Sequence, residues 1–357
     1  MSLWDSALRP LLFRFDSERA HHGAVAAASF GVPVLRATAG FWTRRDARLG
    51  SELAGLALAN PFALAAGFDK DGRFARAAPA LGFGFHCLGT VTPRPQGGNP
   101  KPRMWRIADR RALVNRMGFP NPGVDAVAPM LEAAQRDPRL ADYPYGFSVG
   151  KNKDTPNDDA VADYVLAYRR IRALARFVEV NVSSPNTAGL RDLQTGEFLG
   201  SVLSAMRAVD DDADDGARPP FFLKLAPDLD EAQIDAVAGL AQDGLAQGLC
   251  ATNTLPYSGP TDSSPDAGGG LSGAPLTDRS LEVLQALRAA AGPDVPLVSI
   301  GGVSSGTHAL ARLKAGASAI QVYSAFVYRG PRLARLLCDE LLAAMDAEGI
   351  ESIASLR

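Results

Sequence analysis

Residues 177–191 read FVEVNVSSPNTAGLR, a short apolar run that passes directly into small polar residues. Valine and phenylalanine dominate the run and turn-forming residues follow it, which is typical of a parallel strand covered on both faces. Pro185 disfavours a helical conformation at Ser184, so the polar end is a stiff corner. Ser-Ser-Pro-Asn is also an ordinary turn composition, and the segment alone favours a turn over a functional site.

Seven other apolar runs alternate with amphipathic segments along the chain. Leu281, Leu284 and Leu287 illustrate the helical spacing between the runs. Eight strand–helix units in 357 residues predict an α/β fold, the (β/α)8 TIM barrel, whose active site lies at the C-terminal ends of the strands. The eight predicted strands cover residues 62–68, 83–90, 146–152, 177–184, 221–227, 248–254, 296–302 and 319–326.

Polar residues or glycines follow nearly every predicted strand. They include two lysines, Lys70 and Lys224, and we expect Asp69 to form a structural ion pair with Lys70. Because the strand ends converge on one face of a barrel, these residues predict a site for an anionic or polyoxygenated ligand. The Gly-Gly pair at 301–302 and the Tyr-Ser pair at 323–324 follow the last two strands, where such barrels often bind a cofactor phosphate.

Two long segments interrupt this alternation. Residues 92–119 contain an alternating piece around Trp105, which predicts a β-hairpin over the barrel mouth. Residues 255–275 are predicted to be a second long loop, and both segments are candidate lids. The acidic run at 210–215 is predicted to be a solvated loop at the opposite end of the barrel.

The N-terminal residues predict a small helical extension. Apolar residues from Trp4 to Phe15 recur at helical spacing, and an alanine-rich helical segment follows at 18–30. We therefore divide the chain into an N-terminal helical hairpin, residues 1–45, and a barrel domain, residues 46–357. The spacing leaves two interpretations open, a helix pair packed on the barrel or an appendage that meets a lipid surface.

Composition excludes several classes of function. The apolar fraction of 46% and charged fraction of 21% are ordinary for an enzyme, and a net charge of −2 provides no broad surface for nucleic acid. The three cysteines are isolated, which predicts free thiols in a reducing compartment. The four histidines have no metal-ligand spacing, so we expect no metal. No membrane-spanning stretch or export signal is expected.

Seven motifs occur in family order and together resemble the class 2, membrane-associated dihydroorotate dehydrogenases. They cover residues 65–70, 115–119, 150–153, 181–187, 224–228, 252–254 and 270–273. The resemblance implies a barrel with one FMN per chain that oxidises (S)-dihydroorotate to orotate in de novo pyrimidine biosynthesis. The electrons would pass to a membrane quinone, ubiquinone or menaquinone.

The resemblance also implies roles for individual residues. Ser184 would be the base that removes a proton from C5 while C6 gives a hydride to the flavin, and Lys70 would face the substrate carboxylate. The implied substrate residues are Lys70, Asn115, Arg116, Met117, Gly118, Phe119, Asn181, Asn186, Asn253 and Thr254. The implied FMN residues are Ala66, Gly67, Thr90, Ser148, Asn181, Lys224, Thr252, Gly273, Gly302, Tyr323 and Ser324.

Ser148 departs from the family, which usually has an asparagine that contacts the flavin at this position. The resemblance further implies that the N-terminal helices form the mouth of a quinone tunnel lined by His21, Arg106 and Tyr323. The protein would then be a monomer held peripherally at the cytoplasmic face of the inner membrane. The alternatives are a soluble flavin oxidoreductase with another acceptor, and an inactive flavin- or phosphate-binding barrel that serves as a scaffold.

Overall fold

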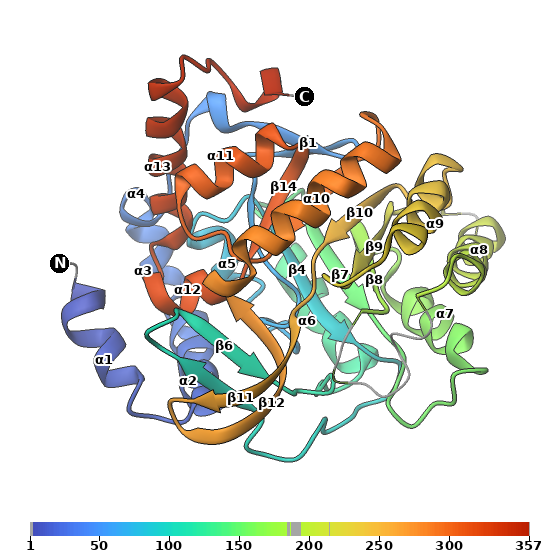
Figure 1. Ribbon diagram of the computed structural model, residues 1–357, viewed down its shortest axis with the longest axis horizontal. Helices are drawn as coiled ribbons and strands as arrows, with labels where there is room; N and C mark the ends of the chain where they lie inside the picture. The colour runs from blue at the N-terminus through green and yellow to red at the C-terminus, as the bar shows by residue number, and fades with distance from the viewer. Residues whose placement is uncertain (1–2, 184–185, 187–193, 214, 357) are drawn as a thin grey trace.

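Eight parallel strands form a closed barrel in this computed structural model, which describes residues 3–183, 186, 194–213 and 215–356 (Figure 1). Around the barrel the strands pair in the order β10-β13-β14-β3-β4-β7-β8-β9, so each pairs with its neighbours in the chain. The predicted (β/α)8 barrel is confirmed. The strands are β3 (Phe62–Leu64), β4 (Phe85–Val91), β7 (Tyr145–Val149), β8 (Phe177–Asn181), β9 (Phe221–Leu225), β10 (Gly248–Ala251), β13 (Leu297–Ile300) and β14 (Ala317–Val322).

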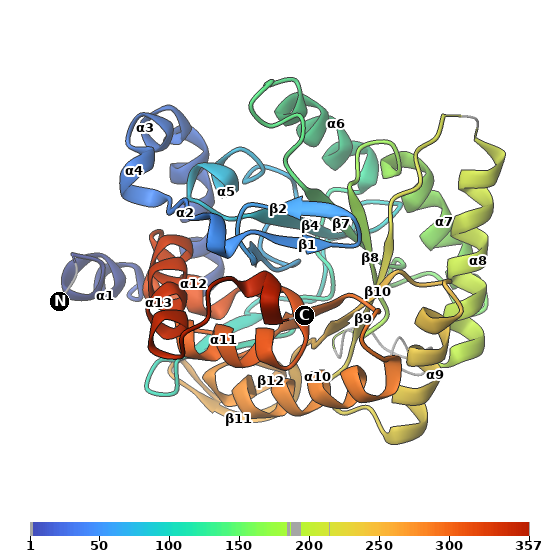
Figure 2. The same cartoon turned by 90° about the horizontal axis from the view of Figure 1, so that it is seen from above.

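Helices surround the barrel (Figure 2). Local sequence sets their starts, as at α9, where the Asp230 carboxylate accepts from the Gln233 backbone N–H and the Gln233 side chain accepts from the Asp230 N–H. The helices are α5 (Ala77–Ala80), α6 (Val124–Gln135), α7 (Ala160–Ile171), α8 (Gly196–Asp212), α9 (Glu231–Gln242), α10 (Thr277–Ala291), α11 (Gly306–Lys314), α12 (Ser324–Arg329) and α13 (Leu333–Ala347).

Strand β8 illustrates how the alternation of side chains builds two cores. Val178 and Val180 belong to the large apolar cluster between the barrel and the helices. Phe177 belongs to the separate cluster inside the barrel. Because side chains alternate along a strand, Glu179 and Asn181 share the inward face with Phe177. The strand thus carries an acidic and an amide side chain inside the barrel.

The two ends of the barrel are covered differently. A short antiparallel hairpin, β1 (Ser51–Leu53) and β2 (Leu56–Leu58), places Leu53 and Leu58 in the interior core cluster. The opposite end carries a four-stranded antiparallel sheet in the order β11-β12-β6-β5 (Figure 1). Short 3-10 helices at 47–49 and 353–356 contact each other.

The predicted hairpin around Trp105 is confirmed as β5 (Met104–Ile107) and β6 (Ala112–Asn115). The prediction of a long loop at 255–275 is wrong, because this segment forms β11 (Leu255–Thr261) and β12 (Ser264–Gly273). Its glycine, serine and proline content is typical of turns, but β12 pairs with β6, a distant partner in sequence.

Two helical parts form the N-terminal segment before residue 31. The first joins η1 (Trp4–Leu8) to α1 (Arg9–Leu12), and the second is α2 (Ser17–Phe30). Two short helices that the sequence did not predict follow, α3 (Val32–Ala37) and α4 (Ala39–Trp42). The Trp4 indole donates a hydrogen bond to the Tyr328 carbonyl, 3.0 Å away on α12, and holds the first helix beside the barrel. Among the described residues no helix combines the length and apolarity needed to cross a bilayer.

Three smaller predictions are corrected. The eighth strand ends at Val322, because α12 begins at Ser324. Asp69 contacts the His86 ring nitrogen at 3.2 Å instead of pairing with Lys70. The acidic run is not wholly solvated, because Asp210 lies in the last turn of α8, is buried, and pairs with Arg172 at 3.0 Å.

Candidate active site

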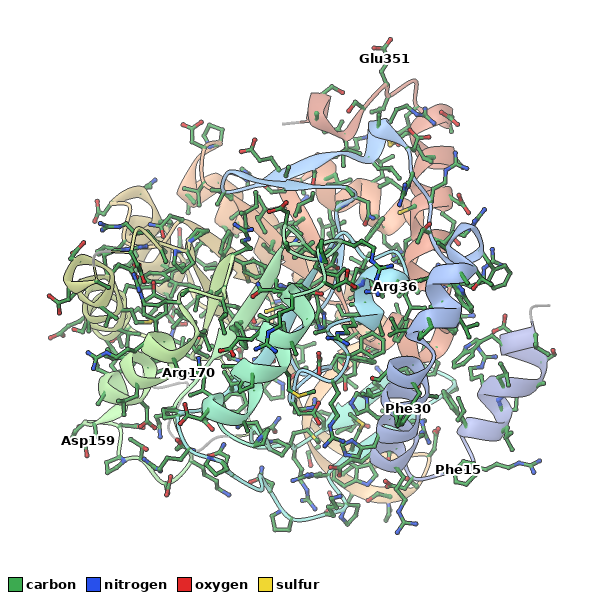
Figure 3. All side chains as sticks on the ribbon, turned by 180° about the vertical axis from the view of Figure 1, so that it is seen from behind. Phe15, Phe30, Arg36, Asp159, Arg170 and Glu351 are labelled. Carbon is green, nitrogen blue, oxygen red and sulfur yellow. The ribbon has the colours of Figure 1, made fainter. Side chains whose placement is uncertain are left out.

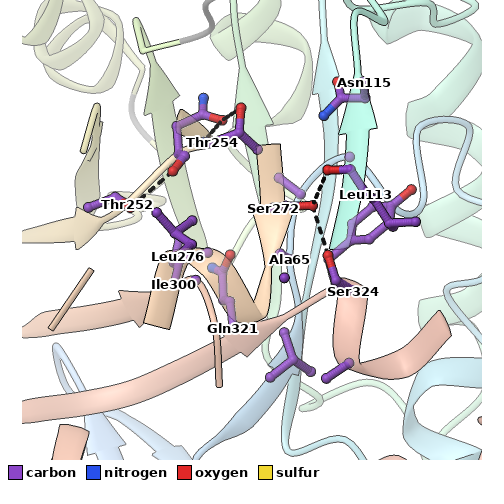
Figure 4. A pocket seen from close by; sticks show the side chains of 18 of the residues that line it. Ala65, Leu113, Asn115, Thr252, Thr254, Ser272, Leu276, Ile300, Gln321 and Ser324 are labelled. Carbon is purple, nitrogen blue, oxygen red and sulfur yellow. Dashed lines mark hydrogen bonds between the residues drawn. The ribbon is translucent and has the colours of Figure 1, made fainter. Parts of the chain in front are cut away.

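A polar cavity lies at the C-terminal ends of the barrel strands, beneath the four-stranded sheet (Figure 4). It brings together most of the residues that the sequence predicted to bind substrate or cofactor. Those that line it are Ala66, Gly67, Lys70, Thr90, Asn115, Met117, Gly118, Phe119, Asn181, Asn186, Lys224, Thr252, Asn253, Thr254, Gly273, Gly302, Tyr323 and Ser324.

A network of amides and hydroxyls forms one wall of the polar cavity. The Asn181 side-chain amide donates to the Thr90 hydroxyl at 2.8 Å, and its carbonyl oxygen accepts from the Ser183 hydroxyl at 3.2 Å. The Asn253 amide donates to the same Ser183 hydroxyl at 3.0 Å. These bonds fix three strand ends relative to one another and orient the amide groups without adding charge.

A second pair of amides crosses from the hairpin to the segment after β8. The Asn186 amide donates to the Asn115 side-chain oxygen at 3.2 Å, and the Asn115 amide donates to the Gly270 carbonyl at 3.4 Å. The Asn99 amide donates to the Asn186 carbonyl at 3.2 Å. The sheet above the barrel and the loop before it therefore contact Asn186, which follows β8.

Lys70 and Lys224 are the two lysines of the cavity lining. The Lys70 ammonium donates to the Gly67 carbonyl. Burial lowers the pKa of Lys70 to about 8, although the Glu18 carboxylate acts in the opposite direction. A lysine with this pKa is mostly charged at neutral pH and loses its charge in mildly alkaline solution.

Lys224 belongs to a buried polar cluster inside the barrel. Its ammonium donates to Glu179 Oε1 at 2.9 Å, and the Gln321 amide donates to Glu179 Oε2 at 3.2 Å. Burial alone would lower the pKa of Lys224, but the Glu179 carboxylate outweighs this effect and raises it. Lys224 is therefore a fixed cation at the floor of the cavity.

Among the described residues, two that were predicted to bind substrate or cofactor are not part of the cavity lining, Ser148 and Arg116. Ser148 is fully buried and its hydroxyl lies 3.0 Å from the Thr90 hydroxyl, so it supports Thr90 from behind. Arg116 has an exposed side chain that lies over the Trp105 ring at 5.0 Å and donates to the Pro102 carbonyl. Ser184, the predicted base, lies outside the described residues.

An apolar cavity lies between α2 and the barrel. Its lining is largely alanine, leucine and aromatic side chains, including Phe68 and Phe326, and it also contains the predicted tunnel residues His21, Arg106 and Tyr323. Met104, Leu113 and Tyr323 line both this cavity and the polar one. The two cavities are therefore adjacent and share one wall.

His21 and Arg106, two of the polar side chains that line the apolar cavity, differ in charge. Burial lowers the pKa of His21 to about 3, and the nearby Lys70 acts in the same direction, so the imidazole is neutral at neutral pH. Its ring packs edge-on against Phe68 at 4.8 Å. The Arg106 guanidinium donates to the Phe15 carbonyl at 2.9 Å and lies over the Phe13 ring at 4.5 Å.

The sequence prediction missed Gln321, Glu179 and Ser272. Gln321 lines the polar cavity, and Glu179 binds it from below. Strand periodicity gave a signal for Glu179, which lies two residues before Asn181 and therefore on the same face of the strand. Ser272, whose hydroxyl lies 2.8 Å from that of Ser324, was within a recognised motif but had no assigned role.

Within the described part of the chain, no group of three or more histidine, cysteine or acidic side chains could hold a metal ion. Cys87, Cys250 and Cys338 are buried free thiols. The polar groups that line the polar cavity are amides, hydroxyls, the two lysines and the side chains of Arg111 and Arg329.

Comparisons with known proteins place these features in context. A family model described as dihydroorotate dehydrogenase matches residues 48–345. The dihydroorotate dehydrogenase (quinone) of Xanthomonas campestris pv. campestris (strain B100) is 45% identical over 332 residues, covering 92% of this chain and 93% of the relative. The protein of the same name from Flavobacterium lutescens is 44% identical with the same coverage.

Solved structures give the same result. The crystal structure of DHODH from Eimeria tenella in complex with ferulenol has a TM-score of 0.85 and 33% identity, and the match covers 97% of both chains. The ligand-free type from the same organism has a TM-score of 0.83 and 35% identity, covering 95% of this chain and 97% of that one.

Proposed function

The chain belongs to the dihydroorotate dehydrogenase family, and we propose that it passes electrons from dihydroorotate through one bound FMN to a quinone. As a member of this family it oxidises dihydroorotate in pyrimidine biosynthesis. The observation that carries the proposed electron path is the shared wall of Met104, Leu113 and Tyr323 between a polar and an apolar cavity. One side suits a flat anionic substrate and the other an apolar quinone.

The residues at the strand ends fit FMN. Gln321 lines the polar cavity, and its Oε1 is a buried acceptor without a hydrogen-bond partner among the described residues, as expected of an atom that a bound ligand would satisfy. Lys224 beside it supplies a cation for the electron-rich edge of a flavin. When bound, FMN supplies the acceptor for the hydride from C6 and passes the electrons onward.

The proposed FMN residues are those of the strand ends. Ser272 and Ser324 place two hydroxyls beside the ends of the last two strands, a position that suits a phosphate group. Gly302 has a positive φ of 71°, and an added Cβ would lie 2.3 Å from the Thr277 Cα, so a side chain cannot be accommodated. The full set is Ala66, Gly67, Thr90, Asn181, Lys224, Thr252, Gly273, Gly302, Tyr323 and Ser324, with Ser148 acting through Thr90.

The substrate is proposed to bind among the amides. Lys70 pairs with its carboxylate, and neutral amides and hydroxyls hold the flat ring; these groups belong to Asn115, Asn181, Asn186, Asn253 and Thr254. Ser184 accepts the proton from C5. Its neighbour Ser183 cannot replace it, because the Ser183 hydroxyl is held by Asn181 and Asn253.

The quinone is proposed to enter the apolar cavity through the N-terminal helices. A neutral His21 and a charged Arg106 are two polar groups there that could bind quinone oxygens, and Tyr323 adjoins the flavin side. The lining of small and aromatic residues suits an isoprenoid-bearing ring. Since one chain completes both cavities, we propose that the monomer is sufficient for turnover.

Exposed apolar residues support a membrane-bound mode of action. Seven of the nine exposed large hydrophobic residues among those described lie in the first 45 residues. Phe15 and Phe30 lie at the N-terminal helices on one side of the molecule (Figure 3). We propose that this apolar face rests on the cytoplasmic side of the inner membrane and opens the tunnel toward lipid.

Anaerobic spectroscopy of protein purified in mild detergent tests the proposal. The visible flavin absorbance should bleach on addition of dihydroorotate and return on addition of a quinone. Bleaching without quinone reoxidation would favour a flavin oxidoreductase with another acceptor. Bound flavin that never bleaches would favour the inactive scaffold, and both results contradict the proposed electron path.

A further inference from the structure

Three side chains form a buried cluster that closes the floor of the polar cavity. Glu179 on β8 accepts from the Lys224 ammonium of β9 at 2.9 Å and from the Gln321 amide of β14 at 3.2 Å. The exposed fraction is 4% for Lys224 and 0% for Glu179 and Gln321. Lys224 and Gln321 line the cavity, whereas Glu179 does not.

The surroundings make Glu179 the partner that decides the charge of Lys224. The other titratable groups that act on Lys224 are the Cys87 and Cys250 thiols, on β4 and β10. Burial raises the pKa of both thiols well above their usual value, so both are neutral. Without Glu179, burial would favour the uncharged amine at Lys224.

Stability alone is a weak reason for this cluster. A buried ion pair costs desolvation of both charges, and apolar residues of similar volume often fill such a place at no loss of stability. Here the cation and the amide of the cluster both face the cavity, and Gln321 Oε1 has no partner among the described residues. The cluster therefore presents a fixed cation and an aimed acceptor to a ligand.

We propose that Glu179 is a positioning residue that sets the reduction potential of the bound flavin by keeping Lys224 charged and Gln321 oriented. This inference rests on the proposed FMN site. The carboxylate holds the ammonium in place and also offsets its charge, so the pair is neutral overall. Reduction of the flavin then proceeds beside a cation whose protonation does not change.

The effect of Glu179→Gln on the potential has a definite sign. At low pH the lysine stays charged while the carboxylate is gone, so the site gains one positive charge and an anionic reduced flavin is stabilised. At high pH the lysine of the oxidised protein is neutral, and reduction draws a proton onto it. The midpoint potential therefore exceeds that of the wild type, and the excess grows as pH falls.

Spectroelectrochemical titration of the flavin-loaded protein measures this effect. Between about pH 9 and about pH 6, we expect Glu179→Gln to steepen the dependence of the midpoint potential on pH. At the acidic end the equilibrium constant for reduction should rise at least about tenfold, which is about 30 mV for a two-electron couple. The Kd for FMN provides a separate readout of binding.

A double-mutant cycle with Lys224→Met gives the matched control. In that background the unpaired buried carboxylate takes up a proton, so adding Glu179→Gln should leave the potential unchanged. A merely structural Glu179 would lower thermal stability or flavin content and leave the potential and its pH slope as in the wild type. That result would overturn the inference.

Different results would contradict the proposed FMN site and the proposed role of Glu179. Wild-type protein that binds no FMN would contradict the proposed function itself. Wild-type protein that binds FMN and is bleached by dihydroorotate, with a potential unaffected by Glu179→Gln, would contradict only the role of Glu179.

Discussion

Ser183 and Ser184 are adjacent hydroxyls with different expected roles. The Ser183 hydroxyl is buried and bonded to Asn181 and Asn253, so it is committed to the structure of the wall. Ser184 is the proposed base for removal of the C5 proton. The two residues therefore form a natural pair for mutagenesis.

We expect Ser184→Ala to slow flavin reduction by dihydroorotate by about 10²- to 10⁴-fold, measured by anaerobic stopped-flow absorbance. Binding of orotate should change little, because the amides and Lys70 that are proposed to hold it remain. The matched control is Ser183→Ala, which should cost less in the reduction rate and more in stability. Equal rates for Ser184→Ala and the wild type would remove Ser184 as the base.

The lowered pKa of Lys70 predicts that substrate binding weakens at alkaline pH. Burial lowers the pKa of Lys70 to about 8, so the free enzyme loses the cation proposed to pair with the substrate carboxylate as pH rises through that value. We expect kcat/KM for dihydroorotate to fall above about pH 8. Lys70→Arg keeps its charge at higher pH, so its alkaline limb should move upward. A profile unaffected by this substitution would assign the limb to another group.

The site residues that the sequence predicted best are those at the ends of the barrel strands. Asn181, Asn253 and Lys224 could be placed together because parallel strands of a barrel end on one face. Gln321 was missed because the sequence of one apolar strand does not predict which residue of another strand its amide contacts. Its partner Glu179 lies on another strand, and only the closed barrel brings the two within 3.2 Å.

A buried ion pair joins α2 to the segment before β5. The Glu18 carboxylate on α2 accepts a hydrogen bond at 2.6 Å from the guanidinium of Arg103, the residue just before β5. Arg103 also donates to the Asn99 carbonyl at 2.9 Å. Asn99 in turn contacts Asn186. The tunnel helix and the proposed substrate segment are thus linked through three side chains.

We expect Glu18→Ala to reduce the protection of α2 amides from hydrogen exchange by about 3 kcal/mol, the cost of leaving a buried charge unpaired. Glu282→Ala, which breaks an exposed pair with Arg279, should leave exchange unchanged. If both variants behave alike, the Glu18 pair does not anchor the helix.

The contribution of Glu18 also has a pH dependence. Burial alone would raise the pKa of Glu18, but the hydrogen bond and charge of Arg103 outweigh this and lower it. A carboxylate with a lowered folded pKa stabilises above its unfolded pKa and loses that effect as pH falls through the folded value. Protection of α2 should therefore decline only in acid.

The four-stranded sheet shows where sequence was insufficient. The hairpin of β5 and β6 was predicted from the residues around Trp105, and all four residues of β5 are buried. Strands β11 and β12 were not, because glycine and proline dominate residues 255–275 and their backbone pairing depends on β6. Local composition and tertiary pairing favour opposite conformations here, and the tertiary pairing prevails.

The molecule as a whole has an asymmetric surface. Phe30 on α2 is 88% exposed and Phe41 on α4 is 51% exposed, whereas Leu166 on α7 is 52% exposed away from the N-terminal helices (Figure 1). If the N-terminal face rests on lipid, its apolar side chains contribute to membrane affinity while a single exposed leucine elsewhere does not.

We expect Phe30→Ser to weaken sedimentation with phospholipid vesicles by about tenfold or more, since burial of a phenylalanine contributes about 1.5–3 kcal/mol. Flavin reduction by dihydroorotate should be unaffected. Leu166→Ser is the matched control and should bind vesicles as the wild type does. Equal weakening by both substitutions would argue against a specific membrane face.

Two adjoining cavities, which we propose serve separate half-reactions, are the central feature of the molecule. Ala20 on α2 lines the apolar cavity, and Ala26 on the same helix is exposed and does not. A tryptophan in place of Ala20 should fill the apolar cavity and leave the polar cavity intact. A tryptophan in place of Ala26 controls for the effect of a tryptophan on the helix itself.

The most direct measurement is double-mixing stopped flow, in which dihydroorotate first reduces the flavin and a quinone then reoxidises it. We predict that Ala20→Trp leaves the reduction rate as in the wild type and slows reoxidation several-fold, while Ala26→Trp changes neither. Equal slowing of both half-reactions, or unimpaired reoxidation with the tunnel filled, would contradict the division of the chemistry between the two cavities.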